Sequence, residues 1–474
     1  MQGAARLRRI FIGERAFYRT VLAIIIPVII QNTLTNAVNL LDNIMVGYVS
    51  TEAMSGVAIA NHLLFVFNLC VFGGLSGPSI FGAQFYGAGD LEGLRNTFRI
   101  KLWISAALLL AAAVAFTGWG DQLIRTYLTG EGGAEKAAVM FQNSKDYLTI
   151  MLAGLIPFAL SQCYSGTLRE TGETMLPMAA GIAAVLTNLC GNWLLIYGNL
   201  GFPAMGVKGA AIATVISRFV ELGVILIGIR RDRRFTFLRG AYRKLSVPMP
   251  LFLDVMRKGM PLLINEALWS LGVATLMQIY SVRGLMVLAG LNIASTITNL
   301  FNVVYIAMGS AVAVIIGQAL GANDLKRARE DVWKLLAFSF GCCIVIGGIL
   351  ALLSPYIPHL YAAEAEVYKL ATRFILASAC LMPINAITHC CYFTLRAGGS
   401  TIVTFLFDCV FSWTISIPFA YFLVHLTGLD IMILVPMSQS IEIIKCLVGL
   451  FLVKRGVWIR NIVAAPSAEI AAEA

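Results

Sequence analysis

The segment GAQFYGAGD at residues 82–90 returns as GQALGAND at residues 317–324. A second segment, TLRETGET at 167–174, returns as TLRAGGST at 394–401. Two matches in the same order predict that the chain consists of two structurally similar halves. The first offset, 234 positions, also relates Pro27 to Pro261, Gln31 to Asn265, Gln84 to Gln318, Gly87 to Gly321 and Asp90 to Asp324, and the second, 227 positions, relates Arg169 to Arg396 and Gly172 to Gly399.

The composition is that of a polytopic membrane protein. Of 474 residues, 59% are hydrophobic and only 13% are charged, whereas a soluble domain carries about 25% charged residues. The formal net charge of +10 does not indicate a nucleic-acid partner, because the basic residues lie in short loops, where the positive-inside rule accounts for them. The ten cysteines fall in apolar segments without CxxC or Cys/His spacing, so we expect neither a disulfide framework nor a zinc site.

Apolar runs long enough to cross a bilayer, which needs about 20 residues, recur along the whole chain. They predict an all-α membrane protein with twelve transmembrane helices in two pseudo-symmetric six-helix bundles. The expected spans are 16–46, 54–85, 98–118, 140–168, 174–198, 207–229, 254–282, 288–319, 332–353, 367–395, 401–424 and 430–453.

Basic loops alternate with loops that are poor in charge. The most basic stretch, about 230–252, divides the spans six and six, and we interpret it as the linker between an N-lobe, residues 1–240, and a C-lobe, residues 241–474. The positive-inside rule predicts that this linker and both termini are cytoplasmic, in a multi-pass protein of the cell (plasma) membrane. No cleavable signal peptide is expected, because no small-residue cleavage site follows the basic start. That start contains Arg6, Arg8, Arg9, Arg15 and Arg19.

One carboxylate lies inside the first apolar run, PVIIQNTLTNAVNLLDNIMVG at residues 27–47. A charge at bilayer depth costs about 3 kcal/mol or more, so we interpret Asp42 as a site that couples movement to a cation or a proton. The alternative is that Asp42 lies at the membrane interface and is simply solvated. Pro27 has no N–H to donate to the same helix, which predicts a bend there.

Three neutral polar side chains could complete a cation site around Asp42. Asn188 and Asn192 are four residues apart and therefore lie on one face of the fifth span. Thr214 could add a hydroxyl from the sixth. Neutral oxygens with one carboxylate suit a monovalent cation such as sodium, although such residues also form ordinary hydrogen bonds between transmembrane helices.

Glu266, near the start of the seventh span, is a second embedded acid and a second candidate for cation coupling. It is not the repeat partner of Asp42, because the repeat places Leu276 at that position. The alternative is a half-buried Glu266 that is bonded to the neighbouring Asn265. Five further polar or aromatic side chains are candidates for a substrate cavity: Gln31, Asn265, Trp269, Asn385 and His389. Trp269 could bind an organic cation through the face of its ring.

The repeated basic residues and glycines have simpler interpretations. Arg169 and Arg396 are expected to extend to the cytoplasmic headgroups. The glycines of the repeated motifs are expected to serve tight turns between helices. These glycines are Gly87, Gly89, Gly172, Gly321 and Gly399.

The motifs together resemble one transporter family. The segments DNIMVG at 42–47, GVKGAAIAT at 206–214 and the two repeats, in this order along about residues 20–450, resemble the multidrug and toxic compound extrusion (MATE) transporters. The resemblance implies two six-helix bundles around a central cavity and secondary antiport, in which an organic cation leaves while sodium ions or protons enter. It implies no other cofactor and no enzymatic activity.

The resemblance also implies roles for individual residues. Asp42 matches the first-helix acid that couples to the cation, Asn188 and Thr214 match oxygen ligands of the same site, and Glu266 matches a seventh-helix acid. Two positions depart from the family pattern, because Asn192 and Asn385 stand where some members carry aspartate. The coupling ion, sodium or proton, therefore stays open.

Other classes of membrane protein fit the sequence less well. A flippase for a lipid-linked saccharide is the main alternative, but it would need several arginines around a pyrophosphate, and Arg283 is the nearest case of a basic residue inside an apolar run. A major-facilitator carrier would show an acid–Arg–x–Gly–Arg pattern after the second span, where this chain reads YGAGDLEGLRN at 86–96. A membrane-embedded enzyme would need clustered acids or histidines. We expect a monomer in the lipid bilayer that binds a small organic cation.

Overall fold

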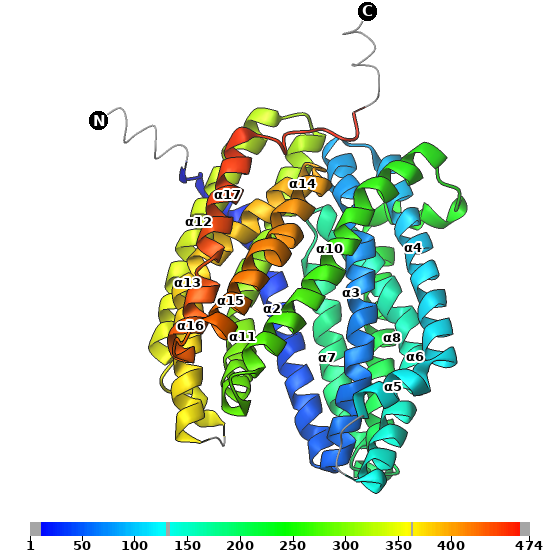
Figure 1. Ribbon diagram of the computed structural model, residues 1–474. Coiled ribbons are helices and arrows are strands. Elements are labelled where there is room, and N and C mark those ends of the chain that lie inside the picture. The colour runs from blue at the N-terminus through cyan, green and yellow to red at the C-terminus, as the bar shows by residue number, and fades with distance from the viewer. Residues whose placement is uncertain (1–10, 129–132, 362–363, 465–474) are drawn as a thin grey trace, which may run out of the picture. The chain divides into compact units, whose positions relative to one another are not determined.

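The computed structural model describes residues 11–128, 133–361 and 364–464, and these are helical, with no strand among them (Figure 1). The predictions for Arg6, Arg8 and Arg9 concern residues outside these ranges. The long helices are α2 (Arg15–Gly47), α3 (Thr51–Gly87), α4 (Leu91–Gly118), α6 (Ala134–Glu170), α7 (Met175–Leu195), α8 (Val207–Arg231), α10 (Met249–Ser281), α11 (Leu285–Gly321), α12 (Leu325–Leu353) and α13 (Ala365–Ala397), followed by the shorter α14 (Thr401–Phe405), α15 (Ile417–Leu426), α16 (Ile431–Gln439) and α17 (Glu442–Arg455).

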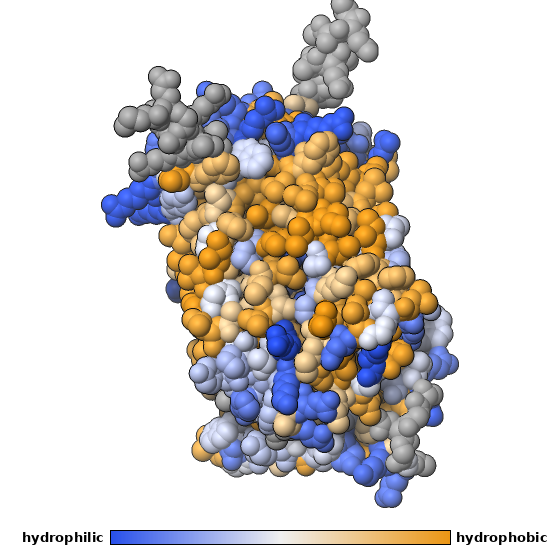
Figure 2. All heavy atoms as spheres, turned by 60° about the vertical axis from the view of Figure 1, so that its left-hand side comes forward, coloured by the Kyte–Doolittle hydropathy of each residue, from blue (hydrophilic) through white to orange (hydrophobic). Residues whose placement is uncertain are grey.

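Twelve of the described helical segments are long and apolar enough to cross a membrane, which confirms the predicted spans. On the face shown in Figure 2, hydrophobic residues form a broad area, and hydrophilic residues gather above and below it. Capping side chains fix where some helices begin. Asp324 accepts a hydrogen bond from the Arg327 N–H at 3.1 Å, and Asp430 accepts one from the Met432 N–H at 2.8 Å. Both residues satisfy backbone donors that have no partner within the helix.

The last two spans are less regular than the sequence predicted. The eleventh contains two π-helical segments, η5 (Leu406–Val410) and η6 (Ser412–Ser416), between α14 and α15. The twelfth tightens into a short turn at Ser440 and Ile441, both of which keep right-handed helical dihedral angles. This turn follows Pro436, which removes one helical hydrogen bond. Residues 119–139, which lie between the third and fourth predicted spans, contain a short helix, α5 (Gly120–Leu128).

The chain forms two compact units. The N-unit comprises Ile30–Ser79 and Leu91–Asp254, and the C-unit comprises the residues up to Ile29, Ile80–Asp90 and the residues from Val255 onward. These units differ from the predicted lobes because α2 and α3 each contribute to both. In α2 the boundary between the units lies between Ile29 and Ile30, shortly after Pro27. In α3 it lies between Ser79 and Ile80, shortly after Pro78.

The linker between the halves is an ordered part of the N-unit. It contains η2 (Arg233–Phe235), α9 (Thr236–Arg239) and η3 (Ala241–Arg243). Three side chains on one face of α4, spaced four residues apart, donate hydrogen bonds to the linker. Their acceptors are three backbone carbonyl groups of the linker that are also four residues apart. The hydrogen bonds run from Arg95 to Phe237 O at 2.9 Å, from Arg99 to Ala241 O at 2.9 Å and from Trp103 to Leu245 O at 3.1 Å.

The repeated motifs contact each other within the C-unit. A Cβ atom on Gly87 would overlap the backbone of Gln318, and a Cβ atom on Gly321 would overlap the backbone of Gln84. Because these four residues are two repeat pairs, the ends of α3 and α11 make a reciprocal contact in which each glycine faces the glutamine of the other repeat. The prediction that these two glycines serve tight turns is wrong, since they allow close approach of two backbones instead.

The turns themselves use the next positions of the motif. Gly89 has φ +76°, and its repeat partner Asn323 has φ +57°. Both therefore end their helices in the left-handed conformation that glycine and asparagine tolerate best. Gly172 and Gly399 also have positive φ values, +85° and +69°, which fits the predicted turns.

We expect Gly321→Ala to destabilise the protein, because the added methyl group would meet the Gln84 backbone and overpacking costs about 1–3 kcal/mol. The matched control is Gly341→Ala, since a Cβ atom there has no neighbour within 4 Å. Thermal unfolding of the detergent-purified variants measures the difference. Equal melting temperatures for the two variants would show that the reciprocal contact is not close packed.

Candidate functional site

Asp42 lies in the N-unit beside the two asparagines that the sequence predicted. The Asn192 side-chain nitrogen donates to Asp42 Oδ1 at 2.6 Å. Asn188 and Asn192 are only 4% and 1% exposed, so α7 buries both amides. The structure thus places one carboxylate of α2 against two neutral amides of α7.

Asn188 connects Asp42 to Thr214. Its amide nitrogen faces Asp42 and donates to the carboxylate oxygens at 2.8 and 3.2 Å, and its oxygen accepts from the Thr214 hydroxyl at 3.0 Å. This orientation avoids placing an amide oxygen against the carboxylate, where two acceptors would meet.

A further acceptor in this cluster has no donor. The Asn192 side-chain oxygen is buried and has no hydrogen-bond partner among the described residues. A buried polar atom without a partner costs free energy, and a cation at this point would satisfy it. The described residues contain no group of three or more His, Cys, Asp or Glu side chains placed to hold a metal. A metal bound by Asp42, Asn188, Asn192 and Thr214 would therefore have one carboxylate and neutral oxygens as ligands, a set that suits sodium.

Two neighbours of Asp42 were not predicted. Tyr147 of α6 is buried, and Arg218 of α8 lies within electrostatic range of Asp42. The Arg218 guanidinium forms an ion pair with Glu221 at 3.4 Å and lies 5.0 Å from the Phe158 ring centroid. Arg218 could have been noticed in the sequence, because it is a basic residue inside the sixth apolar run.

Gln31 and Arg169 bond to each other within the N-unit. The Arg169 guanidinium donates to Gln31 Oε1 at 2.9 Å, and Arg169 Nε is buried without a partner among the described residues. The prediction that Arg169 extends to the headgroups is therefore wrong. Pro27 lies inside the continuous helix α2, as predicted, and the role of a bend there stays a prediction.

The C-unit contains an ion pair that sequence reasoning missed. Lys445 Nζ donates to Asp408 Oδ1 at 2.7 Å, and both side chains are largely buried. Asn265 donates to the other Asp408 oxygen at 2.9 Å. Both charged residues lie inside apolar runs, so each was visible in the sequence, but their pairing depends on how η5 and α17 are rotated.

Glu266 lies near this ion pair. The Tyr392 hydroxyl donates to Glu266 Oε1 at 3.4 Å, and Arg396 lies within electrostatic range of the same carboxylate. The alternative in which Glu266 bonds to Asn265 is wrong, because the Asn265 nitrogen donates to Asp408 and to the Tyr392 hydroxyl. Arg396 is buried over the Phe393 ring and does not extend to the headgroups as predicted.

The remaining cavity candidates have different environments. Trp269 is 47% exposed on α10. His389 packs between Tyr305 and Phe393, with ring centroids 5.3 and 4.9 Å away, and its Nε2 has no partner among the described residues. Of the five predicted cavity residues, Asn385 is the one that lines the cavity described next.

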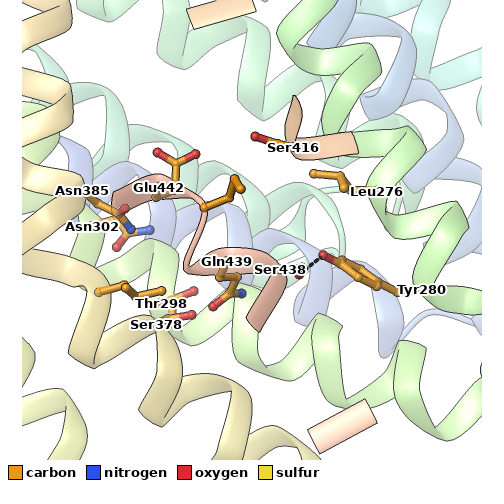
Figure 3. Close-up of a pocket in the computed structure, with 12 residues that line it drawn as sticks. Leu276, Tyr280, Thr298, Asn302, Ser378, Asn385, Ser416, Ser438, Gln439 and Glu442 are labelled. Atoms are coloured by element: carbon orange, nitrogen blue, oxygen red, sulfur yellow. Dashed lines mark hydrogen bonds between the residues drawn. The ribbon is translucent and has the colours of Figure 1, made fainter. Parts of the chain in front are cut away.

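A polar cavity of about 220 Å³ lies within the C-unit. Asn302 and Asn385 lie on one side of it, and Leu276 and Tyr280 lie on the other (Figure 3). The segment between α16 and α17 contributes Gln439 and Glu442. The sequence did not predict this cavity, because the break in the last span and the π-helical segment before it had no clear pattern of their own.

Comparison with known proteins identifies the family. The MatE family model matches residues 27–194 and 261–422, which together make up more than half of the chain. The two matched segments begin at Pro27 and Pro261, which are partners in the repeat.

Relatives and solved structures of this kind cover nearly the whole chain. A protein of Thermotoga maritima named as a probable multidrug resistance protein NorM is 25% identical over 402 residues, 84% of each chain. The multidrug resistance protein PmpM of Pseudomonas aeruginosa is 27% identical over 424 residues, 86% of this chain and 84% of that protein. A solved multidrug resistance MATE family transporter of the MOP superfamily has a TM-score of 0.83 at 21% identity, over 92% of this chain and 95% of that one, and so shows the fold. The resemblance inferred from the motifs is confirmed, and the chain belongs to the MatE family.

Proposed function

We propose that this protein is a secondary antiporter that exports small organic, cationic compounds in exchange for sodium ions or protons. The family membership and the names of the relatives, which are multidrug resistance proteins, support export of drug-like compounds. The observation that carries the coupling is the embedded Asp42 with its two amides and the unpartnered Asn192 oxygen. We assign no enzymatic step to this protein.

The hydrogen bonds of Asp42 suggest how the ion is coupled. When Asp42 is charged and holds no ion, Asn188 and Asn192 both donate to it. A proton or a sodium ion at Asp42 would compete with these amide donors and so change the contacts between α2 and α7. An ion can drive transport only if it binds one conformation better than the other, and contacts that change with occupancy give such a difference. Movement at Pro27 in the same helix would carry the change along α2.

The flippase alternative loses support because three basic residues inside or next to the spans already have partners within the protein. Lys101 pairs with Glu170 at 2.5 Å in the N-unit, and Lys445 pairs with Asp408 in the C-unit. Arg283, the candidate named from the sequence, donates to two backbone carbonyl oxygens, of Val424 and Thr427. These contacts leave these three residues unavailable for a pyrophosphate group.

The remaining parts of the proposal concern assembly and placement. We propose a multi-pass protein of the cell membrane with both termini in the cytoplasm, because the basic loops alternate with loops poor in charge. The two lobes, residues 1–240 and 241–474, would each supply one acid to coupling, Asp42 and Glu266. We propose a monomer, since each candidate site is formed by residues of one unit.

We expect that a sodium gradient or a proton gradient drives efflux of a fluorescent organic cation from proteoliposomes, and that Asp42→Asn reduces efflux to the rate without a gradient. The substitution removes the charge that holds the ion and keeps the shape of the side chain. The measurement applies each gradient separately to the parent protein and to the variant.

Glu52→Gln is the matched control, because it removes an acid that lies near Asp42 in the sequence but takes no part in the Asp42 cluster. Glu52 forms a half-exposed pair with Lys136, at the long distance of 4.0 Å. It should transport like the parent. Full activity of Asp42→Asn would exclude Asp42 as the coupling acid and direct attention to Glu266. Failure of both gradients with the intact protein would contradict the antiport proposal and favour the lipid-linked cargo.

We expect Asn188→Ala to raise the ion concentration needed for half-maximal efflux by about tenfold or more. A hydrogen bond or ligand contact to a charged group contributes about 1.5–3 kcal/mol, and 1.4 kcal/mol corresponds to a factor of ten. The control is Thr187→Ala, which removes a hydroxyl that bonds only to the Ala183 carbonyl of its own helix at 2.8 Å. An ion dependence that is unchanged in Asn188→Ala would mean that the amide takes no part in coupling.

A further inference from the structure

Three polar residues follow one face of α8 away from the candidate ion site. Thr214, Arg218 and Glu221 are separated by four and three residues, and residues with this spacing lie on the same side of a helix. The Thr214 hydroxyl donates to the Asn188 amide oxygen at 3.0 Å, and Asn188 bonds to Asp42. The face of α8 that closes the Asp42 cluster therefore continues directly into a basic and an acidic side chain.

The ion pair between these two charged residues is loose. The Arg218 guanidinium donates to Glu221 Oε2 at 3.4 Å, whereas charge-assisted hydrogen bonds usually measure about 2.7–2.9 Å. The Arg218 side chain is 31% exposed, and the Glu221 side chain is only 6% exposed. Arg218 also lies over the Phe158 ring, 5.0 Å from its centroid. Glu221 thus does not hold the guanidinium tightly, and part of the arginine side chain remains accessible.

Arg218 lies near two acids. It pairs with Glu221, and its charge also acts on Asp42. Tyr147, which is buried, lies within electrostatic range of both Asp42 and Arg218. Since opposite charges attract across such a site, the guanidinium is a cation of the protein itself that competes with a sodium ion or a proton for the same carboxylate.

Glu221 has a second basic neighbour in Arg169 of α6. The charges of Arg169 and Glu221 act on each other, and Arg169 Nε is buried without a partner among the described residues. The Arg169 guanidinium is held by Gln31, to which it donates at 2.9 Å. Gln31 precedes Asp42 by 11 residues, about three helical turns, on the same face of α2. Glu221 would therefore keep a counter-charge if Arg218 turned toward Asp42.

The four charges of this group balance without an ion. Asp42 and Glu221 supply two negative charges, Arg218 and Arg169 supply two positive charges, and all four residues belong to the N-unit. A cation at Asp42 adds a net positive charge beside Arg218, and the repulsion lowers its affinity. Glu221 reduces this effect, because it lies one turn further along α8 and draws the guanidinium away from Asp42.

We propose that Arg218 is a built-in counter-charge that competes with the coupling ion for Asp42, and that Glu221 controls this competition by holding Arg218 away. Both are positioning residues of the ion site, because neither is among its ligands. A tethered competitor prevents the site from holding its ion too tightly, and an antiporter must release the ion on the side opposite to uptake. The inference rests on the proposed function in taking Asp42 as the ion site.

Equilibrium binding of radioactive sodium to the purified full-length chain tests this competition without any gradient, at constant ionic strength and one mildly alkaline pH. We expect Arg218→Gln to bind sodium about fivefold more tightly than the parent and Glu221→Gln to bind it about fivefold more weakly, as for charge interactions at partly exposed sites. The double variant Arg218→Gln/Glu221→Gln should bind at least as tightly as the parent. A direct effect of the Glu221 charge would instead persist without Arg218.

The controls separate charge from shape and from loss of the fold. Arg218→Lys keeps the charge and should bind sodium like the parent. Arg125→Gln should also bind like the parent, because Arg125 likewise lies over a phenylalanine ring, that of Phe141 at 4.8 Å, but belongs to α5 and takes no part in the Asp42 cluster. The melting temperature of each variant is measured in parallel, and a damaged fold does not account for tighter binding.

The sign of the change in affinity decides the question. Sodium binding by Arg218→Gln that is tighter than that of the parent, or that appears only in this variant, supports the proposal. Binding that is no tighter in Arg218→Gln, including no binding by any variant, overturns it, and so does an equal loss on Glu221→Gln with and without Arg218. If Glu221→Gln does not fold, the comparison of Arg218→Gln with Arg218→Lys decides.

The outcome is distinguishable from failure of the antiport proposal, because sodium binding is measured without a gradient and efflux with one. Opposite shifts in sodium affinity in a protein without gradient-driven efflux would support the counter-charge and contradict antiport. Gradient-driven efflux with the same sodium affinity in the parent and in Arg218→Gln would overturn the counter-charge and leave antiport standing.

Discussion

A polar group inside the hydrocarbon layer can be satisfied only by other groups of the protein, and this constraint organises both units. Asp42 is held by the amides of α7, Lys101 is paired with Glu170, and Lys445 is paired with Asp408. Each of these contacts joins two different membrane spans. The helices therefore have fixed rotations about their axes, because turning one of them would leave a carboxylate or an ammonium group facing lipid.

The two halves of the repeat meet this constraint in different ways. In the N-unit, the acid bonds to neutral amides, and the Arg218 within electrostatic range of it is paired with Glu221, so the charge of Asp42 can be balanced by an ion from outside. In the C-unit, the position equivalent to Asp42 is Leu276, and the acid Asp408 already has Lys445 as a counter-ion. The acid Glu442, which lines the same cavity as Leu276, forms no ion pair among the described residues. The units thus share a helical plan but differ in how their buried acids are partnered.

The spans and the first polar cluster could be predicted because their signals are local. Twelve apolar runs follow directly from composition, and the spacing of Asn188 and Asn192 places both amides on one face of a helix. The Asp408–Lys445 pair could not be predicted in the same way, because the two residues are visible as charges but their meeting depends on the packing of two spans. The break before Glu442 was missed because Pro436 alone does not specify where a helix ends. Arg169 was misjudged because its partner, Gln31, is far away in the sequence.

The reciprocal contact between Gly87 and Gln318 and between Gly321 and Gln84 bears on the ancestry of the chain. Each repeat supplies the same glycine and the same glutamine, so the contact is self-complementary, as in a homodimer whose subunits are related by a two-fold axis. Two separate copies of a six-helix protein could form it without any change of sequence. Fusion of their genes would then have preserved an existing interface, and differences between the halves, such as Leu276 at the position equivalent to Asp42, could arise once the copies no longer had to be identical.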